Sequence, residues 1–163
     1  IDNVSVKEIT NAVEYKNIPQ SARELYTFED DTWVGSNELV TNGDFATDSD
    51  WFLQGLAEIS GGTVNFIDAG SNTYSSIRQS LNNAAGDTYR IKLTISNYIS
   101  GKLYVRFVSG EEVDIDIHNG SFTVDVLSSV TNGIFEMGRV FSAGTYSFSV
   151  DSVSVKRLVE VPE

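Results

Sequence analysis

The stretch TYRIKLTISN at residues 88–97 carries the strongest fold signal in this chain of 163 residues. Its apolar side chains, from Tyr89 to Ile95, occupy every second position, and polar or basic side chains fill the positions between them. Because successive side chains of an extended strand point to opposite faces, this spacing predicts a β-strand with one buried face. Arg90 and Lys92 are then expected to point away from the core.

The same alternation recurs along most of the chain, between short turns that contain Gly. Many short strands separated by such turns are typical of two antiparallel sheets that pack face to face. We therefore predict an all-β fold, an antiparallel β-sandwich. Its expected strands lie at residues 38–41, 51–54, 63–67, 74–81, 88–97, 102–108, 111–118, 121–126, 134–141 and 145–156.

One hairpin is predicted in register, because Asn119-Gly120 is a preferred pair for a two-residue type I′ turn. Such a turn places Ile117 opposite Phe122 and leaves Asp114 opposite Asp125, where two carboxylates repel unless a cation lies nearby. The apolar residues expected in the core are Ile115, Ile117, Phe122 and Val124. The acidic residues expected to share the outer face are Asp114, Asp116 and Asp125.

Length and composition limit the range of functions. With 40% hydrophobic and 11% aromatic residues, the chain has enough apolar side chains to close one core. Eleven basic and 23 acidic residues give a net charge of −12, which opposes binding to nucleic acid and to anionic membranes. The absence of Cys excludes disulfides and thiolate chemistry, and no apolar run approaches the ~20 residues that span a bilayer.

The beginning and the end of the chain resemble each other. IDNVSVKEI at residues 1–9 and VDSVSVKRL at residues 150–158 share five identical residues of nine. Because the later copy closes the predicted sandwich, we expect the first copy to end a preceding module or to be donated to a neighbour, and the chain to be a piece of a longer polypeptide. The expected organisation is a terminal strand at 1–9, an irregular connector at 10–37, a module at 38–158 and a tail at 159–163.

Four segments of the chain resemble a known family of modules. They are ELVTNGDFATDSDWFLQG (38–55), GDTYRI (86–91), HNGSFTV (118–124) and GTYSFSVDSVSVK (144–156). Together they are similar to jelly-roll carbohydrate-binding modules of the family 4/9 type, and to their relatives in bacteriophage tail, fibre and other virion proteins. The resemblance implies a jelly roll at 38–158 within a chain of tandem modules. It does not choose between a module that binds sugar and one that only builds a particle.

A glycan-binding groove in such a fold would use aromatic and guanidinium groups that alternation directs away from the core. The candidate ligand-binding residues are Tyr104, Arg106, Arg90, Lys92, Arg78 and Trp33. Cross-strand ion pairs, such as Arg106 beside Asp114, explain the same charges without a ligand. Trp51 follows the first turn, where the resemblance implies a buried aromatic residue, so we expect Trp51 in the core. The other interpretation is that Trp51 or Phe52 stacks on a sugar ring.

A structural calcium ion is implied by the resemblance alone. Related modules hold one between an acidic residue after NGDF and the Asp of the final strand, because calcium prefers carboxylate and carbonyl oxygens. Asp151 matches the second position, but Ala46 stands at the first. The possible substitutes nearby are Asp44, Asp48 and Asp50, and Asp44 is the candidate ligand together with Asp151. Apart from this ion, no cofactor is expected.

Catalysis is not predicted, because the sequence contains no nucleophile elbow, phosphate loop or His-Glu-x-x-His motif. We predict a non-catalytic structural or adhesion module of a phage-like virion or fibre, located on a virion or in the extracellular space. Its expected partners are neighbouring copies or modules. The alternative is a carbohydrate-binding module that recognises a cell-surface or polysaccharide glycan. Neither interpretation involves nucleic acid or membrane insertion.

Overall fold

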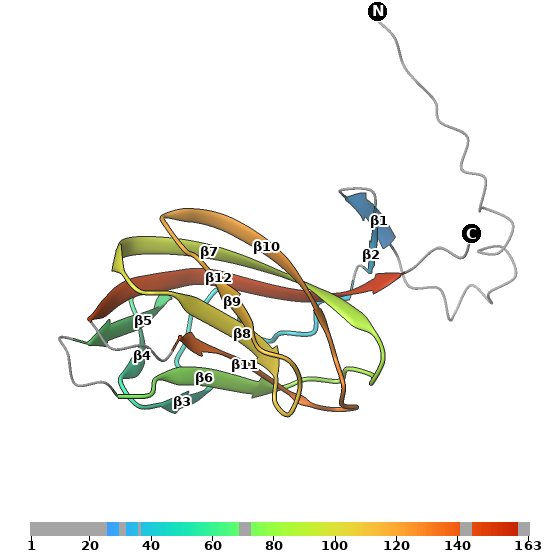
Figure 1. The fold of residues 1–163 in the computed structure, drawn as a ribbon, viewed down its shortest axis with the longest axis horizontal. Helices are drawn as coiled ribbons and strands as arrows, with labels where there is room; N and C mark the ends of the chain where they lie inside the picture. Colours follow the sequence, from blue (N-terminus) through green and yellow to red (C-terminus); the bar gives the residue numbers. More distant parts are fainter. Residues whose placement is uncertain (1–25, 30–31, 36, 69–72, 141–144, 160–163) are drawn as a thin grey trace, which may run out of the picture.

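The computed structural model describes residues 26–29, 32–35, 37–68, 73–140 and 145–159. All regular elements in these ranges are β-strands, and they form two antiparallel sheets that pack face to face (Figure 1). The predicted antiparallel β-sandwich is therefore confirmed. This part of the chain contains no helix that is long and apolar enough to cross a membrane.

The larger sheet has seven strands. The long strands β7 and β12 lie side by side at its centre, and β10 pairs with the other edge of β7. Beyond β12 lie β5 and β4 along the first part of its length, and β2 and β1 at its end. The strands are β1 (Tyr26–Glu29), β2 (Thr32–Gly35), β4 (Ala57–Ser60), β5 (Thr63–Asp68), β7 (Thr88–Ser100), β10 (Gly120–Leu127) and β12 (Tyr146–Val159).

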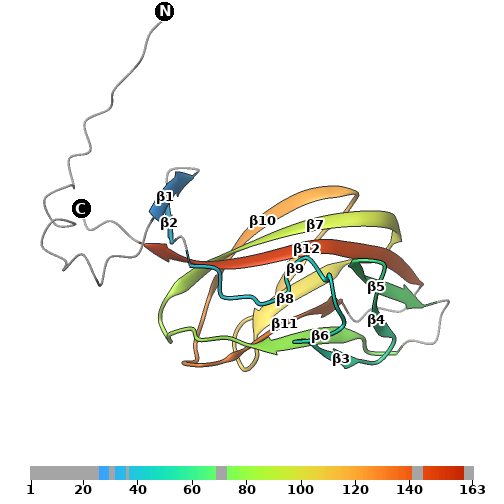
Figure 2. The ribbon, with the colours of Figure 1, turned by 180° about the vertical axis from the view of Figure 1, so that it is seen from behind.

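The smaller sheet has five strands in the order β3-β6-β11-β8-β9. Every neighbouring pair in it is antiparallel. Seen from behind in Figure 2, β3 and β6 lie at the margin of the sandwich that is farthest from β10. The strands are β3 (Phe52–Gln54), β6 (Ser76–Ser80), β8 (Leu103–Phe107), β9 (Val113–Ile115) and β11 (Ile134–Arg139).

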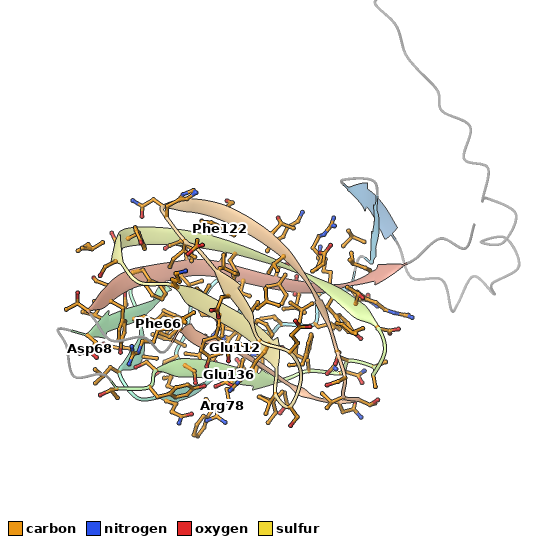
Figure 3. All side chains as sticks on the ribbon, in the orientation of Figure 1. Phe66, Asp68, Arg78, Glu112, Phe122 and Glu136 are labelled. Carbon is orange, nitrogen blue, oxygen red and sulfur yellow. The ribbon has the colours of Figure 1, made fainter. Side chains whose placement is uncertain are left out.

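Alternation along the strands supplies the core between the two sheets, and the inward side chains of β7 and β12 are almost fully buried. Phe66 and Phe148 stack with ring centroids 5.1 Å apart, and Figure 3 shows Phe66 between the layers. Trp51 is 7% exposed, and its indole Nε1 donates a hydrogen bond to the carbonyl oxygen of Asn42 at 3.0 Å. The interpretation of Trp51 as a core residue is therefore confirmed.

The predicted hairpin around Asn119-Gly120 is wrong. β9 pairs with β8 in the smaller sheet, whereas β10 pairs with β7 in the larger sheet, so the chain crosses between the sheets at this point. A type I′ turn needs a positive φ at both central residues. Of the two, only Gly120 has one, at 137°.

The inward and outward faces of these two strands were nevertheless predicted correctly, because both strands turn their apolar side to the same core. The buried or partly buried residues are Ile115, Ile117, Phe122 and Val124. The exposed residues are Asp114, Asp116 and Asp125. Since the strands belong to different sheets, Asp114 and Asp125 lie on opposite outer faces of the sandwich, and the expectation of one shared acidic face is corrected.

The register between β8 and β9 also differs from the prediction, by two residues. Tyr104 lies opposite Asp114. Arg106 pairs with Glu112 instead of Asp114, with Nη1 2.9 Å from Oε2. A shift of two residues keeps every side chain on its predicted face, so alternation carries no information about it.

The connector that was predicted to be irregular contains a β-hairpin. β1 and β2 pair with each other, and β2 continues beside the end of β12, where Val34 lies opposite Leu158. Strands β1, β2 and β4 were not predicted. Strand β12 ends at Val159, one residue inside the tail that was predicted at 159–163. The segment at 38–41 is not a regular strand, although the Leu39 amide donates to the Val155 carbonyl at 3.0 Å. The terminal strand predicted at 1–9 lies outside the described residues.

Candidate functional site

The outer face of the smaller sheet carries a cluster of charged and aromatic side chains around one carboxylate. Glu136 on β11 lies at its centre, opposite Arg106 on β8 and Arg78 on β6 in the strand register. Tyr104 on β8 and Tyr74, which precedes β6, complete this set, called here the Glu136 cluster. Figure 3 labels Glu136 and Arg78 on their neighbouring strands.

Both carboxylate oxygens of Glu136 are paired within the protein. Arg106 donates to Oε2 from Nη2 at 2.8 Å and from Nε at 3.0 Å. The hydroxyl groups of Tyr74 and Tyr104 donate to Oε1 at 2.7 Å and 3.1 Å, and Nε of Arg78 lies 3.8 Å from the same oxygen. With 1% of its surface exposed, Glu136 is a buried carboxylate held by two cations and two phenols.

Burial of Glu136 would by itself raise the pKa of its carboxyl group. The hydrogen bond from Tyr74 and the hydrogen bonds and positive charge of Arg106 outweigh this effect, so the pKa lies below its usual value. Burial acts in the opposite sense on the phenol of Tyr104 and raises its pKa. At neutral pH Glu136 is therefore ionised and Tyr104 is neutral, which suits structural pairing better than proton transfer.

Tyr104 points to the predicted outer face, but other side chains cover it. The residue is 1% exposed. The guanidinium carbon of Arg106 lies 5.2 Å from its ring centroid, and its hydroxyl oxygen lies against that of Tyr74. This corrects the expectation of an accessible ring, because long side chains on neighbouring strands can cover an outward residue in the middle of a sheet.

An open groove of about 590 Å³ lies beside the Glu136 cluster, where β3, β6 and β11 run next to one another. Its lining residues are Thr41, Asp50, Phe52, Arg78, Gln79, Ser80 and Ile134. Phe52 is 64% exposed and provides the aromatic surface of the groove. The guanidinium carbon of Arg78 lies 5.2 Å from the ring centroid of Phe52, and Arg78 also bonds to the side chain of Gln54. Arg78 therefore belongs to both the cluster and the groove.

The loop at 41–51 forms one wall of the groove and is held by Gln79. The Gln79 side chain accepts a hydrogen bond from the Thr41 amide at 2.8 Å, and it donates to the carbonyl oxygens of Thr41 at 2.9 Å and Asp50 at 3.0 Å. The residues of this loop with a positive φ are Asn42 (53°), Phe45 (54°) and Asp50 (69°). Asn and Asp adopt such angles readily, but a bulky residue such as Phe45 keeps one only where surrounding contacts impose it, so this wall has a defined shape.

Arg90 and Lys92 lie on the outer face of the larger sheet, away from the Glu136 cluster. Arg90 is 5% exposed, and its Nε and Nη2 lie 2.9 Å and 3.0 Å from the two carboxylate oxygens of Asp125. The cross-strand ion pair that was the other interpretation of these charges is therefore present here. The backbone of Trp33 pairs with Phe28 in β1, and its side chain lies outside the described part of the structure.

The candidate calcium ligands Asp44 and Asp151 belong to no larger acidic cluster among the described residues. Asp151 accepts a hydrogen bond from the Ser96 hydroxyl at 2.5 Å, and Asp44 accepts one from the Ala46 amide at 3.4 Å. Calcium takes six to eight oxygen ligands. Among the described residues there is no group of three or more acidic or His side chains that could hold a metal ion. The calcium site that the resemblance implies therefore stays a prediction.

The fold is similar to that of solved carbohydrate-binding modules. TmCBM61, solved in complex with β-1,4-galactotriose, gives a TM-score of 0.52 at 17% identity, covering 75% of this chain and 99% of that one. The CBM1 module of BiXyn10A, solved without ligand, gives a TM-score of 0.50 at 11% identity, covering 70% of this chain and 94% of that one. Similarity at these identities establishes the shared fold alone.

The virion setting predicted from the sequence receives no comparable support. The enzymatically active domain of tailspike protein 4 of bacteriophage CBA120 gives a TM-score of 0.48 at 14% identity, covering 74% of this chain and 21% of that one. No family model and no curated protein matches the chain. The fold class is thus established, and the virion setting stays a prediction.

The sequence interpretation did not single out Glu136. It considered Asp50 only as a substitute calcium ligand, and Phe52 only as one of three aromatic residues that could stack on sugar. A signal for Glu136 was present, because a single acidic residue inside the apolar strand IFEMGR at 134–139 must be paired if that strand is buried. Phe52 and Asp50 carry no such signal. Their place in the groove depends on the loop at 41–51, whose shape is set by long-range contacts with β6.

Proposed function

We propose that this chain is a non-catalytic carbohydrate-binding module whose binding site is the groove on the outer face of the smaller sheet. The observation that carries the proposal is the exposed ring of Phe52 next to the guanidinium group of Arg78 in an open, polar-walled groove. An aromatic ring offers an apolar surface for the C–H face of a sugar, and neighbouring polar groups bond to its hydroxyls.

The rest of the groove supplies the polar groups that such a ligand needs. Thr41 and Ser80 carry hydroxyl groups that both donate and accept, Asp50 carries a carboxylate acceptor, and Arg78 carries N–H donors. Sugar hydroxyls are donors and acceptors in turn, so a mixed set of this kind suits them. The presence of a galactotriose complex among the proteins of similar fold supports this choice of ligand class.

The state of Glu136 supports a binding function over catalysis. A glycosidase needs one carboxyl group with a raised pKa as general acid, next to a second carboxylate across a cleft. The pKa of Glu136 is lowered, and both its oxygens are occupied by Arg106, Tyr74 and Tyr104. Its environment thus keeps it charged and engaged, which is the opposite of what a proton donor requires.

This proposal replaces the structural module of a virion as the preferred interpretation, because the groove is the feature of the described surface that calls for a ligand. Attachment to neighbouring copies or modules stays a prediction from the repeated terminal sequence. A module that recognises polysaccharide would meet its ligand outside the cell, so we propose an extracellular location.

A glycan array with the purified chain tests the proposal. Wild type should bind at least one glycan, and Phe52→Ala should lose most of that binding, because the stacking surface is removed while the core stays intact. Ile99→Ala is the matched control, since Ile99 is a 77% exposed apolar residue on the larger sheet. Binding that survives in Phe52→Ala, or release of sugar by the wild type, would contradict the proposal.

A further inference from the structure

The positive and negative charges on the outer face of the smaller sheet are not equally paired. Arg78 and Arg106 both contact Glu136, and Arg106 also contacts Glu112. Asp50, in contrast, forms no ion pair with any other described residue, and its Oδ2 accepts a hydrogen bond from the Ser49 hydroxyl at 2.8 Å. Asp50 is thus a carboxylate on the groove wall that has no ion-pair partner among the described residues.

The position of Asp50 on the groove wall is fixed by the backbone. Its φ is 69°, and its carbonyl oxygen accepts a hydrogen bond from the Gln79 side chain at 3.0 Å. The next residue but one in the chain is Phe52, the aromatic surface of the groove. A sugar that stacks on Phe52 would consequently lie close to the Asp50 carboxylate.

We propose that Asp50 is a selectivity residue that makes the groove accept uncharged polysaccharides and reject acidic ones. The inference rests on the proposed glycan-binding function and adds the substrate class to it. A neutral sugar donates hydroxyl hydrogen bonds to the carboxylate, and charged acceptors make such bonds stronger. A uronic acid places a second negative charge in the same space, where the one cation among the groove residues, Arg78, already lies 3.8 Å from the Glu136 carboxylate.

The size of the expected discrimination follows from Coulomb's law. Two like charges about 6 Å apart weaken binding by roughly threefold where bulk water screens them, and by up to about a hundredfold at the lower effective permittivity of a protein surface. Salt at about 1 M shortens the screening length to about 3 Å and should remove most of the difference. The net charge of −12 acts in the same direction but over the whole surface.

Affinity electrophoresis with matched polymers tests the inference. The probes are unmodified galactan, xylan, mannan and mixed-linkage β-glucan, each compared with its own carboxymethylated form at low and high salt. The variant Asp50→Asn keeps the shape of the side chain, and Asn tolerates a positive φ. Asp48→Asn is the matched control, because Asp48 is an exposed residue of the same loop that does not line the groove, and its replacement changes the net charge equally.

Wild type and Asp48→Asn should bind an unmodified polymer at least about threefold more tightly than its carboxymethylated form. In Asp50→Asn at low salt this ratio should be at least about threefold smaller than in Asp48→Asn, which has the same net charge. Equal binding of both forms by wild type, or the same ratio in the two variants, would overturn the selectivity inference and leave glycan binding in place. Failure to bind any of the eight polymers, together with a negative glycan array, would overturn both.

Discussion

At the scale of single residues, Glu136 decides how the outer face of the smaller sheet is built. A lone buried carboxylate would be strongly unfavourable, because it loses its hydration shell. Here it gathers two arginines and two tyrosines from β6, β8 and the segment before β6, and one of the arginines, Arg78, also lines the groove. One acidic residue thus links the structure of the sheet to the shape of the proposed site.

Replacing Glu136 with Gln should lower the free energy of unfolding by roughly 2–4 kcal/mol, because Arg106 and Tyr74 would lose a charged partner in a buried position. Urea unfolding followed by intrinsic fluorescence measures the change. Glu112→Gln is the control, since the Glu112 side chain is 40% exposed and its pairing with Arg106 should contribute below about 1 kcal/mol. Equal effects of the two substitutions would contradict the role given to Glu136.

The lowered pKa of Glu136 also predicts how stability depends on pH. In the unfolded chain its pKa is near 4.5, and in the folded protein it is lower, so the unfolded state binds more protons between these values. The contribution of Glu136 to stability is therefore complete above pH 4.5 and is lost as the pH falls through the folded pKa. Urea unfolding of wild type and Glu136→Gln from pH 7 to pH 3 should show a difference that shrinks below about pH 4.5. A constant difference would argue against this linkage.

At the scale of secondary structure elements, the crossing between β9 and β10 determines the two sheets. The chain passes from the edge of the smaller sheet to the edge of the larger sheet over a few residues around Asn119-Gly120. Each strand keeps its apolar side toward the common core, and Asp125 finds Arg90 on β7 as its partner instead of facing Asp114. The ion pair removes the carboxylate repulsion that the predicted hairpin would have created.

Engineered disulfides can distinguish the observed pairing from the hairpin. Thr94 and Ser121 are directly opposite each other in β7 and β10, so the double variant Thr94→Cys/Ser121→Cys should form a disulfide under mild oxidation. Asp114→Cys/Asp125→Cys should not, because these positions lie on opposite outer faces. The chain has no Cys of its own, so titration of free thiols gives a direct readout. A disulfide in the second variant and not in the first would restore the hairpin.

At the scale of the whole molecule, the two outer faces of the sandwich differ in character. The larger sheet carries a ladder of polar side chains that bond to one another, including Asn65 with Ser149 at 2.7 Å and Ser96 with Asp151 at 2.5 Å. The smaller sheet carries the Glu136 cluster and the groove with the exposed ring of Phe52. The exposed aromatic ring is the reason why we propose the glycan site on the smaller sheet.

The repeated sequence at residues 1–9 and 150–158 also concerns the whole molecule, because it suggests how copies or modules follow one another. In the structure, the later copy at 150–158 belongs to β12, which pairs with β7 along its length and contacts β5 and β2 on its other side. The closing role predicted for this segment is consistent with that position. The role of residues 1–9 stays a prediction.

What the sequence determined by itself was the fold class and the direction of most side chains. A period of two in apolar residues reports local geometry, because each extended residue turns its side chain to the face opposite that of its neighbour. Ile117 and Phe122 are therefore directed to the core, and Arg78 and Arg106 to an outer face, whatever strand lies beside them. The same alternation does not show which strands pair with each other.

Only the tertiary structure decided the pairing of strands and the site that follows from it. A strand can pair in another sheet, or shift its register by two residues, and every side chain still points to the same face. The alternation of apolar residues therefore cannot distinguish these arrangements. The choice depends on contacts between residues far apart in the chain, such as Arg90 with Asp125, Arg106 with Glu136, and Gln79 with the loop at 41–51. Those contacts place Arg78, Phe52 and Asp50 around one groove, and they place Arg90 and Lys92 on the other face of the molecule.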